Sequence, residues 1–494
     1  MMNALEKSDS AIVAMKLANN AAVPKAAAEL VEPRAGTKGN TEQLHTRRTQ
    51  CRGSVSQRLN RVRNAARQRK KEKFTALLHH IDVNLLLESF MALKRHAAAG
   101  VDKVTWEDYE AQLSGNLQDL HKRVQSGAYR ALPVRRVFIP KADGRQRPLG
   151  IAALEDKIVQ RATVAVLNAI YEEDFLGFSY GFRPKRGQHD ALDALSVAIS
   201  STRVNWILDA DIKGFFDAVD QQWLIRFLEH RIGDERIIRL VDKWLKAGVL
   251  EKGQWQSSDM GTPQGAVISP LLANIYLHYV CDLWAKQWRK REAKGNVIVV
   301  RYADDMVAGF ELETDARRFL DAMRARFEQF GLELHGEKTR LIEFGRFAAD
   351  RRKRRGQGKP ETFTFLGFTF ICGKSRKGSF QLQRKTRTDR MRAKLLEIKT
   401  QMRKRMHASI PEQGKWLRSV VMGFNAYHAV PTNQRALSAF RHHVVELWRK
   451  SLRRRSQKTK LTWERMTELA SNWLPTPRIL HPWPEQRFVV KHPR

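Results

Sequence analysis

The sequence predicts an α+β protein in which a mixed region of helices and strands precedes a basic, all-helical region. Val297–Phe310 consists of two apolar, β-rich arms around a short acidic centre, which is typical of a hairpin. Beyond about residue 380, apolar residues recur at helical spacing, as in Met391, Leu395, Ile398 and Met402. With 494 residues, the chain is long enough for roughly two to four domains.

Positive charge dominates the composition. The chain has 89 Lys and Arg residues against 52 Asp and Glu residues, a formal net charge of +37. A protein this basic needs a polyanion partner or an anionic surface. A merely solvated surface is the alternative, although such surfaces usually mix both signs. The three dispersed cysteines support neither a zinc module nor a disulfide framework. No stretch approaches the roughly 18 apolar residues of a membrane span, so we expect no membrane partner.

The N-terminal region is expected to begin disordered and to become helical. Residues 1–57 have no sustained hydrophobic period. Residues 58–73 form a basic run that is compatible with a helix. Within this run, Arg63 and Arg67 either contact phosphate groups or belong to a solvated helix face, and the residues alone do not separate the two interpretations.

A hairpin is predicted within residues 134–151. Val137–Ile139 is strand-like, Asp143-Gly144 is a turn signal, and a second extended segment follows. The tip of this hairpin would therefore carry three cations, Lys141, Arg145 and Arg147.

Acidic residues follow two apolar strands that are expected to lie in one sheet. Trp206–Ile212 is a buried-type strand that becomes acidic at Asp209 and Asp211, and the later hairpin carries Asp304 and Asp305 at its centre. Carboxylate oxygens suit Mg²⁺, and two such ions ~3.5–4 Å apart can hold the attacking and leaving oxygens of a phosphoryl transfer. An Asp-rich turn also has a purely local explanation, because Asp caps its own backbone.

Six segments resemble, in the same order, motifs of the reverse transcriptases of the bacterial group II intron branch. Each motif is weak alone, whereas six in order are specific. They include Tyr302-Ala303-Asp304-Asp305, which resembles the catalytic hairpin, and the strand ending that begins at Asp211, which resembles the first metal-binding motif. The six matching segments are 139–150, 181–184, 211–217, 261–270, 302–305 and 365–368.

The resemblance implies a right-hand polymerase, with fingers and a ferredoxin-like palm, followed by an all-helical thumb and a maturase region called domain X. The expected bounds are 1–57 for a largely disordered basic N-terminal segment, 58–205 for the N-terminal extension and fingers, 206–372 for the palm, and 373–494 for the thumb and maturase region.

The resemblance also assigns the metal site and the choice of sugar. It implies that Asp211, Asp304 and Asp305, with the backbone carbonyl of Ile212, hold two Mg²⁺ ions, for which Mn²⁺ can substitute. Asp209 competes with Asp211, because residues two apart share a strand face. Phe216 resembles the aromatic residue that excludes a ribose 2′-hydroxyl, which favours DNA synthesis; core packing is its alternative role.

Further residues are expected to handle the incoming nucleotide. Lys141 and Arg147 resemble the fingers residues that grip the triphosphate, with Arg145 as an alternate. Gln264 resembles the residue that touches the incoming sugar and base. Lys338 resembles the lysine that protonates pyrophosphate, although the family usually has Asn where this chain has His335.

The flanks indicate which RNA is bound. Lys394 and Arg403 lie in basic thumb helices that would follow a template–primer duplex, and Arg63 and Arg67 would add RNA contacts. Residues 416–433 resemble the core of domain X, in which Tyr427 either stacks on an unpaired base or packs in the core. The paired cysteines of the HNH nuclease that many relatives carry are not seen, so we expect no DNA cleavage by that module.

These features together predict an RNA-directed DNA polymerase that is also a maturase. It would bind its group II intron RNA to promote splicing and would copy that RNA into target DNA from dNTPs, in a cytoplasmic, nucleoid-associated ribonucleoprotein. A related reverse transcriptase of phage defence or diversity generation, and a splicing-only maturase, are the alternatives. Phe216 disfavours an RNA polymerase.

Overall fold

The computed structural model describes residues 42–140, 146–257, 260–455 and 461–491. Residues 1–41 and the tip of the first hairpin lie outside the described residues, so the predictions for Lys141 and Arg145 are not addressed by it. Helix α2 (Glu42–Gln68) begins before the boundary expected at residue 57, and its exposed and buried positions alternate where it packs on α6 (Leu154–Asp174).

The fingers region combines helices with a small sheet. Strands β1 (Val134–Pro140) and β2 (Gln146–Ile151) form the predicted antiparallel hairpin, and β4 and β5 extend it in the order β2-β1-β4-β5. The segment 221–245 forms two helices, and the carboxylate of Asp234 caps the second. The other elements are η1 (Leu78–His80), α3 (Val83–Met91), α4 (Trp106–Glu110), α5 (Leu113–Ser126), α7 (Gln188–Ser201), α9 (Gln221–Glu229), α10 (Glu235–Lys246), β4 (Val249–Glu251) and β5 (Gln254–Gln256).

The palm is a four-stranded antiparallel sheet in the order β6-β7-β3-β8. Its β-α-β-β-α-β succession and strand order are those of a ferredoxin-like fold, as expected. β6 is buried along its apolar residues, which explains its unbroken run of Val and Ile. The elements are β3 (Trp206–Ala210), α8 (Phe215–Ala218), α11 (Ser269–Leu277), the π-helical turn η2 (His278–Asp282), α12 (Leu283–Arg291), β6 (Val297–Tyr302), β7 (Asp305–Phe310), α13 (Glu313–Glu328), β8 (Arg340–Glu343) and α14 (Ala348–Arg354).

A second sheet connects the palm to the C-terminal helices. It contains β9 (Phe363–Phe365), β10 (Phe368–Lys374) and β11 (Phe380–Thr386) in the order β11-β10-β9. The prediction that residues 373–494 are all-helical is therefore wrong for the first part of that range. β11 pairs with the whole of β10 from Phe368 to Lys374, so the segment is part of a sheet.

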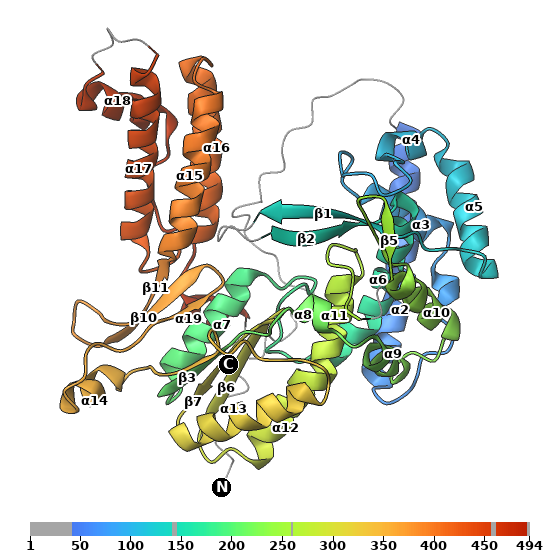
Figure 1. Cartoon of the computed structure of the whole chain (residues 1–494), viewed down its shortest axis with the longest axis horizontal. Helices are drawn as coiled ribbons and strands as arrows, with labels where there is room; N and C mark the ends of the chain where they lie inside the picture. Colours follow the sequence, from blue (N-terminus) through green and yellow to red (C-terminus); the bar gives the residue numbers. More distant parts are fainter. Residues whose placement is uncertain (1–41, 141–145, 258–259, 456–460, 492–494) are drawn as a thin grey trace.

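The C-terminal helices form a core of their own. Ile398, Leu417, Phe440 and Trp448 are among its buried residues, and this cluster is separate from the large cluster that joins fingers and palm. In Figure 1 these helices stand apart from the fingers, and the β1–β2 hairpin extends between the two groups. The helices are α15 (Thr388–Lys404), α16 (Ile410–His428), α17 (Gln434–Arg453), α18 (Trp463–Trp473) and α19 (Pro484–Lys491), the last of which packs on α7. Across the described residues, no helix has the length and apolarity needed to cross a membrane.

Candidate active site

A cavity of about 1030 Å³ lies where the palm sheet faces the β9–β11 sheet and the first thumb helices. Five carboxylates line it, together with cations from β8, the segment before β8 and α15. The acidic lining residues are Asp209, Asp211, Asp304, Asp305 and Glu337, and the basic ones are Lys338, Arg340, Arg387 and Arg390.

Strand register brings the predicted aspartates together. β3 and β7 pair with Ala210 opposite Met306, so the same register, continued by one residue, puts Asp211 opposite Asp305. Paired residues of antiparallel strands project to the same face. Asp304 occupies the two-residue turn of the β6–β7 hairpin beside Ala303, which adopts a left-handed φ of 56°. The sheet therefore delivers two aspartates from its strands and one from its turn.

The electrostatics of this cluster are those of crowded carboxylates. Burial raises the pKa of Asp305 to about 7, and the charges of Asp304, Asp211 and Asp209 add to the rise. Burial also raises the pKa of Asp304, with Asp211 adding to it and Arg147 opposing it. Because each carboxylate disfavours ionisation of the others, the cluster favours a cation.

Asp209 and Asp211 share the cavity but differ in position. Burial raises the pKa of Asp209 to about 6, with the Asp211 charge adding to the rise and Arg340 opposing it. In the pairing of β3 with β7, Asp209 lies opposite Val307, whereas Asp211 follows Ala210 and falls opposite Asp305. Asp211 therefore lies nearer to the turn than its rival does.

The backbone that follows β3 adds a carbonyl oxygen on the side of the strand that faces β7. The Lys213 N–H donates to the Glu333 carbonyl at 2.9 Å. Because the N–H and C=O of a trans peptide point in opposite directions, the Ile212 carbonyl points away from that segment and toward the β7 side of β3. Three carboxylates and a carbonyl are a hard-oxygen donor set that suits Mg²⁺.

Lys338 occupies part of this donor set. Its Nζ donates to Asp211 Oδ2 at 2.8 Å, and the pair is about a third to half exposed. Within the described part of the chain, no three acidic, His or Cys side chains converge closely enough to form a preassembled metal site. The aspartates thus share one cavity without a common centre, which is expected when mutual repulsion and a lysine act on them.

A buried arginine fixes the position of the β6–β7 turn, which carries Asp304. The guanidinium of Arg301 donates to Asp282 at 2.6 and 2.7 Å, and the two side chains are 1% and 0% exposed. Its Nη1 donates to the Ala303 carbonyl at 2.8 Å, and its Nη2 donates to Ser179 Oγ at 2.7 Å. Asn274 accepts from Nη1 at 3.1 Å. Sequence patterns alone did not identify Arg301, although a charged residue in an otherwise apolar strand was a signal.

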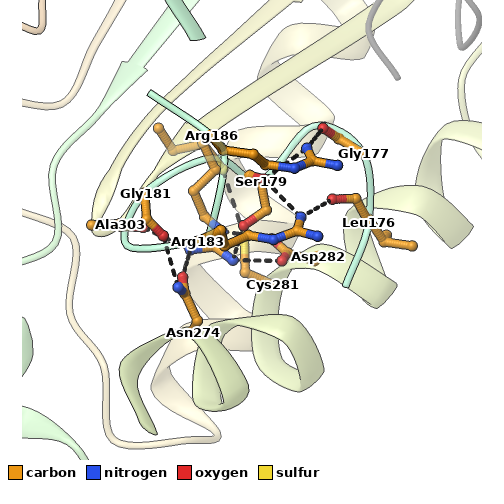
Figure 2. Close-up of polar contacts among 12 residues, drawn as sticks. Leu176, Gly177, Ser179, Gly181, Arg183, Arg186, Asn274, Cys281, Asp282 and Ala303 are labelled. Atoms are coloured by element: carbon orange, nitrogen blue, oxygen red, sulfur yellow. Dashed lines mark hydrogen bonds and ion pairs between the residues drawn. The ribbon is translucent and has the colours of Figure 1, made fainter. Parts of the chain in front are cut away.

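The loop that follows α6 supports the same turn. Figure 2 shows Arg183 and Arg186 reaching carbonyls of this loop, and Arg183 donates to Leu176 and Ser179 at 2.7 and 2.8 Å. Asn274 donates to the Gly181 carbonyl at 2.7 Å. A Cβ on Gly181 would lie 2.1 Å from the Ala303 nitrogen, so only glycine allows this close approach. The motif at 181–184 therefore buttresses the turn.

The residues expected to handle the nucleotide, Arg147, Phe216 and Gln264, are not among those that line the cavity. Arg147 lies close enough to Asp304 to lower its pKa. With its amide oxygen facing Arg147, Gln264 accepts from the guanidinium at 2.7 and 3.1 Å and donates to the Pro148 carbonyl. The Gly150 N–H donates to the Gln264 carbonyl at 2.6 Å. Phe216 is half-buried against the core in α8, and its carbonyl accepts from Thr262.

The predicted RNA contacts lie outside this cavity, with one exception. Arg63 and Arg67 pair with the buried carboxylate of Glu173, so part of their charge is used within the fold. Lys394 pairs with Glu397, whereas Arg403 is exposed on α15. Tyr427 lines the cavity, and its hydroxyl donates to the Leu366 carbonyl at 2.7 Å.

Known proteins share this arrangement of motifs. Residues 139–370 match the family model described as reverse transcriptase (RNA-dependent DNA polymerase). Protein YkfC of Escherichia coli is 34% identical over 317 residues, which cover 57% of this chain and 78% of that protein. The chain belongs to the reverse transcriptase family.

Other relatives of this reverse transcriptase are named for introns. Group II intron-encoded protein LtrA of Lactococcus lactis is 34% identical over 222 residues, which cover 44% of this chain and 37% of LtrA. Nuclear intron maturase 3 of Arabidopsis thaliana is 26% identical over 221 residues, which cover 39% of this chain and 30% of that protein. The reverse transcriptase segment of this chain is therefore similar to proteins named for introns, and its match spans little more than a third of LtrA.

Proposed function

We propose that this protein is an RNA-directed DNA polymerase and a maturase that binds a group II intron RNA, promotes its splicing and copies it into DNA. The observation that carries the polymerase activity is the gathering of Asp211, Asp304 and Asp305 in one cavity, with Arg147 of the fingers beside it. The relatives named for introns support the choice of RNA.

The metal site of this proposal uses the oxygens described above. Asp211, Asp304, Asp305 and the Ile212 carbonyl would hold two Mg²⁺ ions, with Mn²⁺ as a substitute. When bound, such ions lower the pKa of a primer 3′-hydroxyl and neutralise charge on the departing pyrophosphate. The ammonium group of Lys338 forms an ion pair with Asp211 and balances its charge.

The other side chains around the site are assigned separate roles in the reaction. Arg147 orients and neutralises the triphosphate, because a cation aimed at developing charge stabilises the transition state. Lys338 is positioned to give a proton to the leaving group. Phe216 excludes the ribose 2′-hydroxyl, which selects dNTPs, and Gln264 contacts the incoming sugar and base.

The maturase activity would depend on the flanks. We assign residues 58–205 to the N-terminal extension and fingers, which the segment 221–256 joins through strands β4 and β5, the rest of 206–372 to the palm, and 373–494 to the thumb and domain X. The basic faces of α15, including Arg403, would follow the template–primer duplex through phosphate and 2′-hydroxyl contacts. Such a protein would work as a ribonucleoprotein with its intron RNA in the cytoplasm, where target DNA is accessible.

Two assays on one variant separate the activities. Primer extension on an RNA template with dNTPs and Mg²⁺ is expected for the wild type and should be lost in Asp304→Ala. Splicing of a group II intron at low Mg²⁺ should survive that change, because folding support does not use the carboxylate. Lys290→Ala, on the exposed end of α12, is the matched control. Primer extension by Asp304→Ala at the control rate would refute the site.

A further inference from the structure

Two adjoining grooves lie at the end of the palm farthest from the fingers. One has a volume of about 410 Å³ and lies between the start of α14 and the β10–β11 hairpin, and the other, of about 310 Å³, lies between that hairpin and the segment before α19. Arg346, Ser379 and Phe380 line both grooves, so they form one continuous surface, here called the double groove. Figure 1 shows the β10–β11 hairpin and α14 on the side of the palm opposite the fingers.

Exposed cations lie in and beside the double groove. Arg346 and Lys374 line it and are exposed, and Arg376 and Lys377 are exposed in the adjoining turn of the hairpin. Within the described residues, no carboxylate forms an ion pair with any of these four side chains, whereas Arg384, which also lines the second groove, is paired with Asp193. The exposed acidic side chains that line the grooves are Asp350 and Glu485. With Arg376 and Lys377 included, the surface therefore has a net positive charge that attracts phosphate.

Aromatic rings lie among these cations. Phe347 is 50% exposed and Trp483 is 41% exposed, and each lines one groove. Phe380 is half-buried and is shared by both. Exposed aromatic side chains interleaved with cations form the surface on which proteins stack unpaired bases while they contact the backbone. Double-stranded RNA, in contrast, is recognised through its shape and its 2′-hydroxyls, without stacking.

The hairpin that carries the cations is held firmly. The Ser375 N–H donates to the Ser379 carbonyl at 2.8 Å, and the Gly378 N–H donates to the Ser375 carbonyl at 3.0 Å. The two serine hydroxyls are 2.7 Å apart. A turn closed in this way presents its side chains at fixed positions, which reduces the entropy lost on binding.

The double groove is separate from the catalytic cavity. Both lie along the same two strands, but Phe365–Gly367 and Arg387 line the catalytic cavity, whereas Gly373-Lys374 and Phe380 line the grooves. Among the described residues, none that lines the catalytic cavity also lines either groove. The six steps along β10 from Phe368 to Lys374 span roughly 20 Å at about 3.3 Å per residue, and the second groove extends back to Arg384, which pairs with Phe370. A nucleic acid in the grooves would therefore leave the polymerase site open.

We propose that the double groove is a second RNA-binding site, which holds an unpaired segment of RNA through stacking on Phe347, Phe380 and Trp483. Arg346, Lys374, Arg376 and Lys377 contact its phosphates. The choice of RNA over other polyanions rests on the proposed function. Such a site lets the protein keep hold of a looped or single-stranded part of its RNA while a duplex occupies the catalytic cavity.

The test measures binding and polymerisation separately in the full-length protein. The R376E/K377E variant changes two exposed cations of the hairpin, and K290E/R291E makes the same change of charge on α12, far from the grooves. Fluorescence anisotropy follows a labelled 12-nucleotide single-stranded RNA in the presence of excess unlabelled template–primer, which occupies the catalytic cavity. Competition with the matching RNA duplex and single-stranded DNA identifies the preferred form. Phe347→Ala tests stacking without a change of charge.

R376E/K377E should bind the single strand at least 10-fold more weakly than K290E/R291E. The slope of log K against log salt should fall by about 1.4, since each lost phosphate contact on a single strand contributes about 0.7. Phe347→Ala should weaken binding several-fold, and neither variant should change primer extension more than twofold. Equal binding by both charge variants, preference for the duplex, or a parallel loss of primer extension would overturn the proposal. Wild-type protein without primer extension would refute the polymerase function but not this site.

Discussion

The contact between Arg301 and the Ala303 carbonyl predicts that a buried ion pair controls the geometry of the metal-binding turn. The perturbation is the double variant Arg301→Met/Asp282→Leu, which replaces the pair with apolar side chains of similar volume. Such replacements of a buried pair are often neutral for stability, whereas removal of one partner alone costs about 3–5 kcal/mol. The double variant should therefore fold, while Arg301→Met alone should unfold at clearly lower urea concentration.

The expected loss of activity follows from the hydrogen bond that the double variant lacks. A bond from a charged donor contributes about 1.5–3 kcal/mol. If the whole free energy of this hydrogen bond serves to position the turn, its loss should slow polymerisation by about 10- to 150-fold, at about 1.4 kcal/mol per factor of ten. Arg301→Lys should keep the pair with Asp282 but lose the fork that also reaches Ser179 and Ala303, with an intermediate effect.

The assay is single-turnover primer extension over a range of Mg²⁺ concentrations, with template–primer binding measured in parallel. A misplaced turn should raise the Mg²⁺ concentration needed for half-maximal rate and should leave template–primer affinity unchanged. A merely structural pair would lower the amount of folded protein without moving the Mg²⁺ dependence. A folded double variant that polymerises at the wild-type rate with the wild-type Mg²⁺ requirement would refute the reasoning.

Three further predictions concern the sugar, the turn and the fingers. Phe216→Ala should raise incorporation of rNTPs relative to dNTPs at least 10-fold in single-nucleotide extension, and unchanged selectivity would return Phe216 to core packing. Gly181→Ala should slow extension more than it destabilises the fold, as followed by urea unfolding, because the added Cβ meets the Ala303 nitrogen at 2.1 Å; a wild-type rate would contradict this contact. Burial raises the pKa of Asp156 to about 6, so its stabilising contribution is complete below its ordinary pKa and is lost as the pH rises through about 6. The wild type should therefore lose stability as the pH is raised from 4 to 7, and the Asp156→Asn variant should lose less. An equal shift of the urea midpoint in the two proteins over that pH range would contradict this prediction.

Local patterns were sufficient to predict the carboxylates of the site. Strand alternation and the acidic centre of a hairpin are properties of neighbouring residues, so the sequence alone places Asp304 and Asp305 at a turn. The preference for Asp211 over Asp209 rested on its spacing from Phe216. The structure adds the register between β3 and β7, which joins residues about 100 positions apart and puts Asp211 nearer than Asp209 to Asp305. The role of Asp211 as a metal ligand stays a prediction.

The support of the site could not be predicted in the same way. The partners of Arg301 come from the loop after α6, from α11 and from the π-helical turn, so no local pattern contains them. Tertiary contacts also explain why Arg63 and Arg67 are less available to RNA than the charge pattern suggested, since both form ion pairs with Glu173 of α6. β11 was missed although Phe380 and Leu382 alternate with glutamines, and the structure identifies the strand by its antiparallel pairing with β10.

The most direct test of the central claim is rapid-quench incorporation of one dNTP on an RNA template at saturating Mg²⁺. The wild type is expected to extend the primer, and Asp304→Asn, which keeps the size of the side chain, should be at least ~1,000-fold slower, because loss of a ligand to the metal removes several kcal/mol of transition-state stabilisation. Template–primer affinity should stay within about twofold, since the phosphate contacts are unchanged. Extension by Asp304→Asn at a rate near that of the wild type would contradict the assignment of this cavity as the polymerase site.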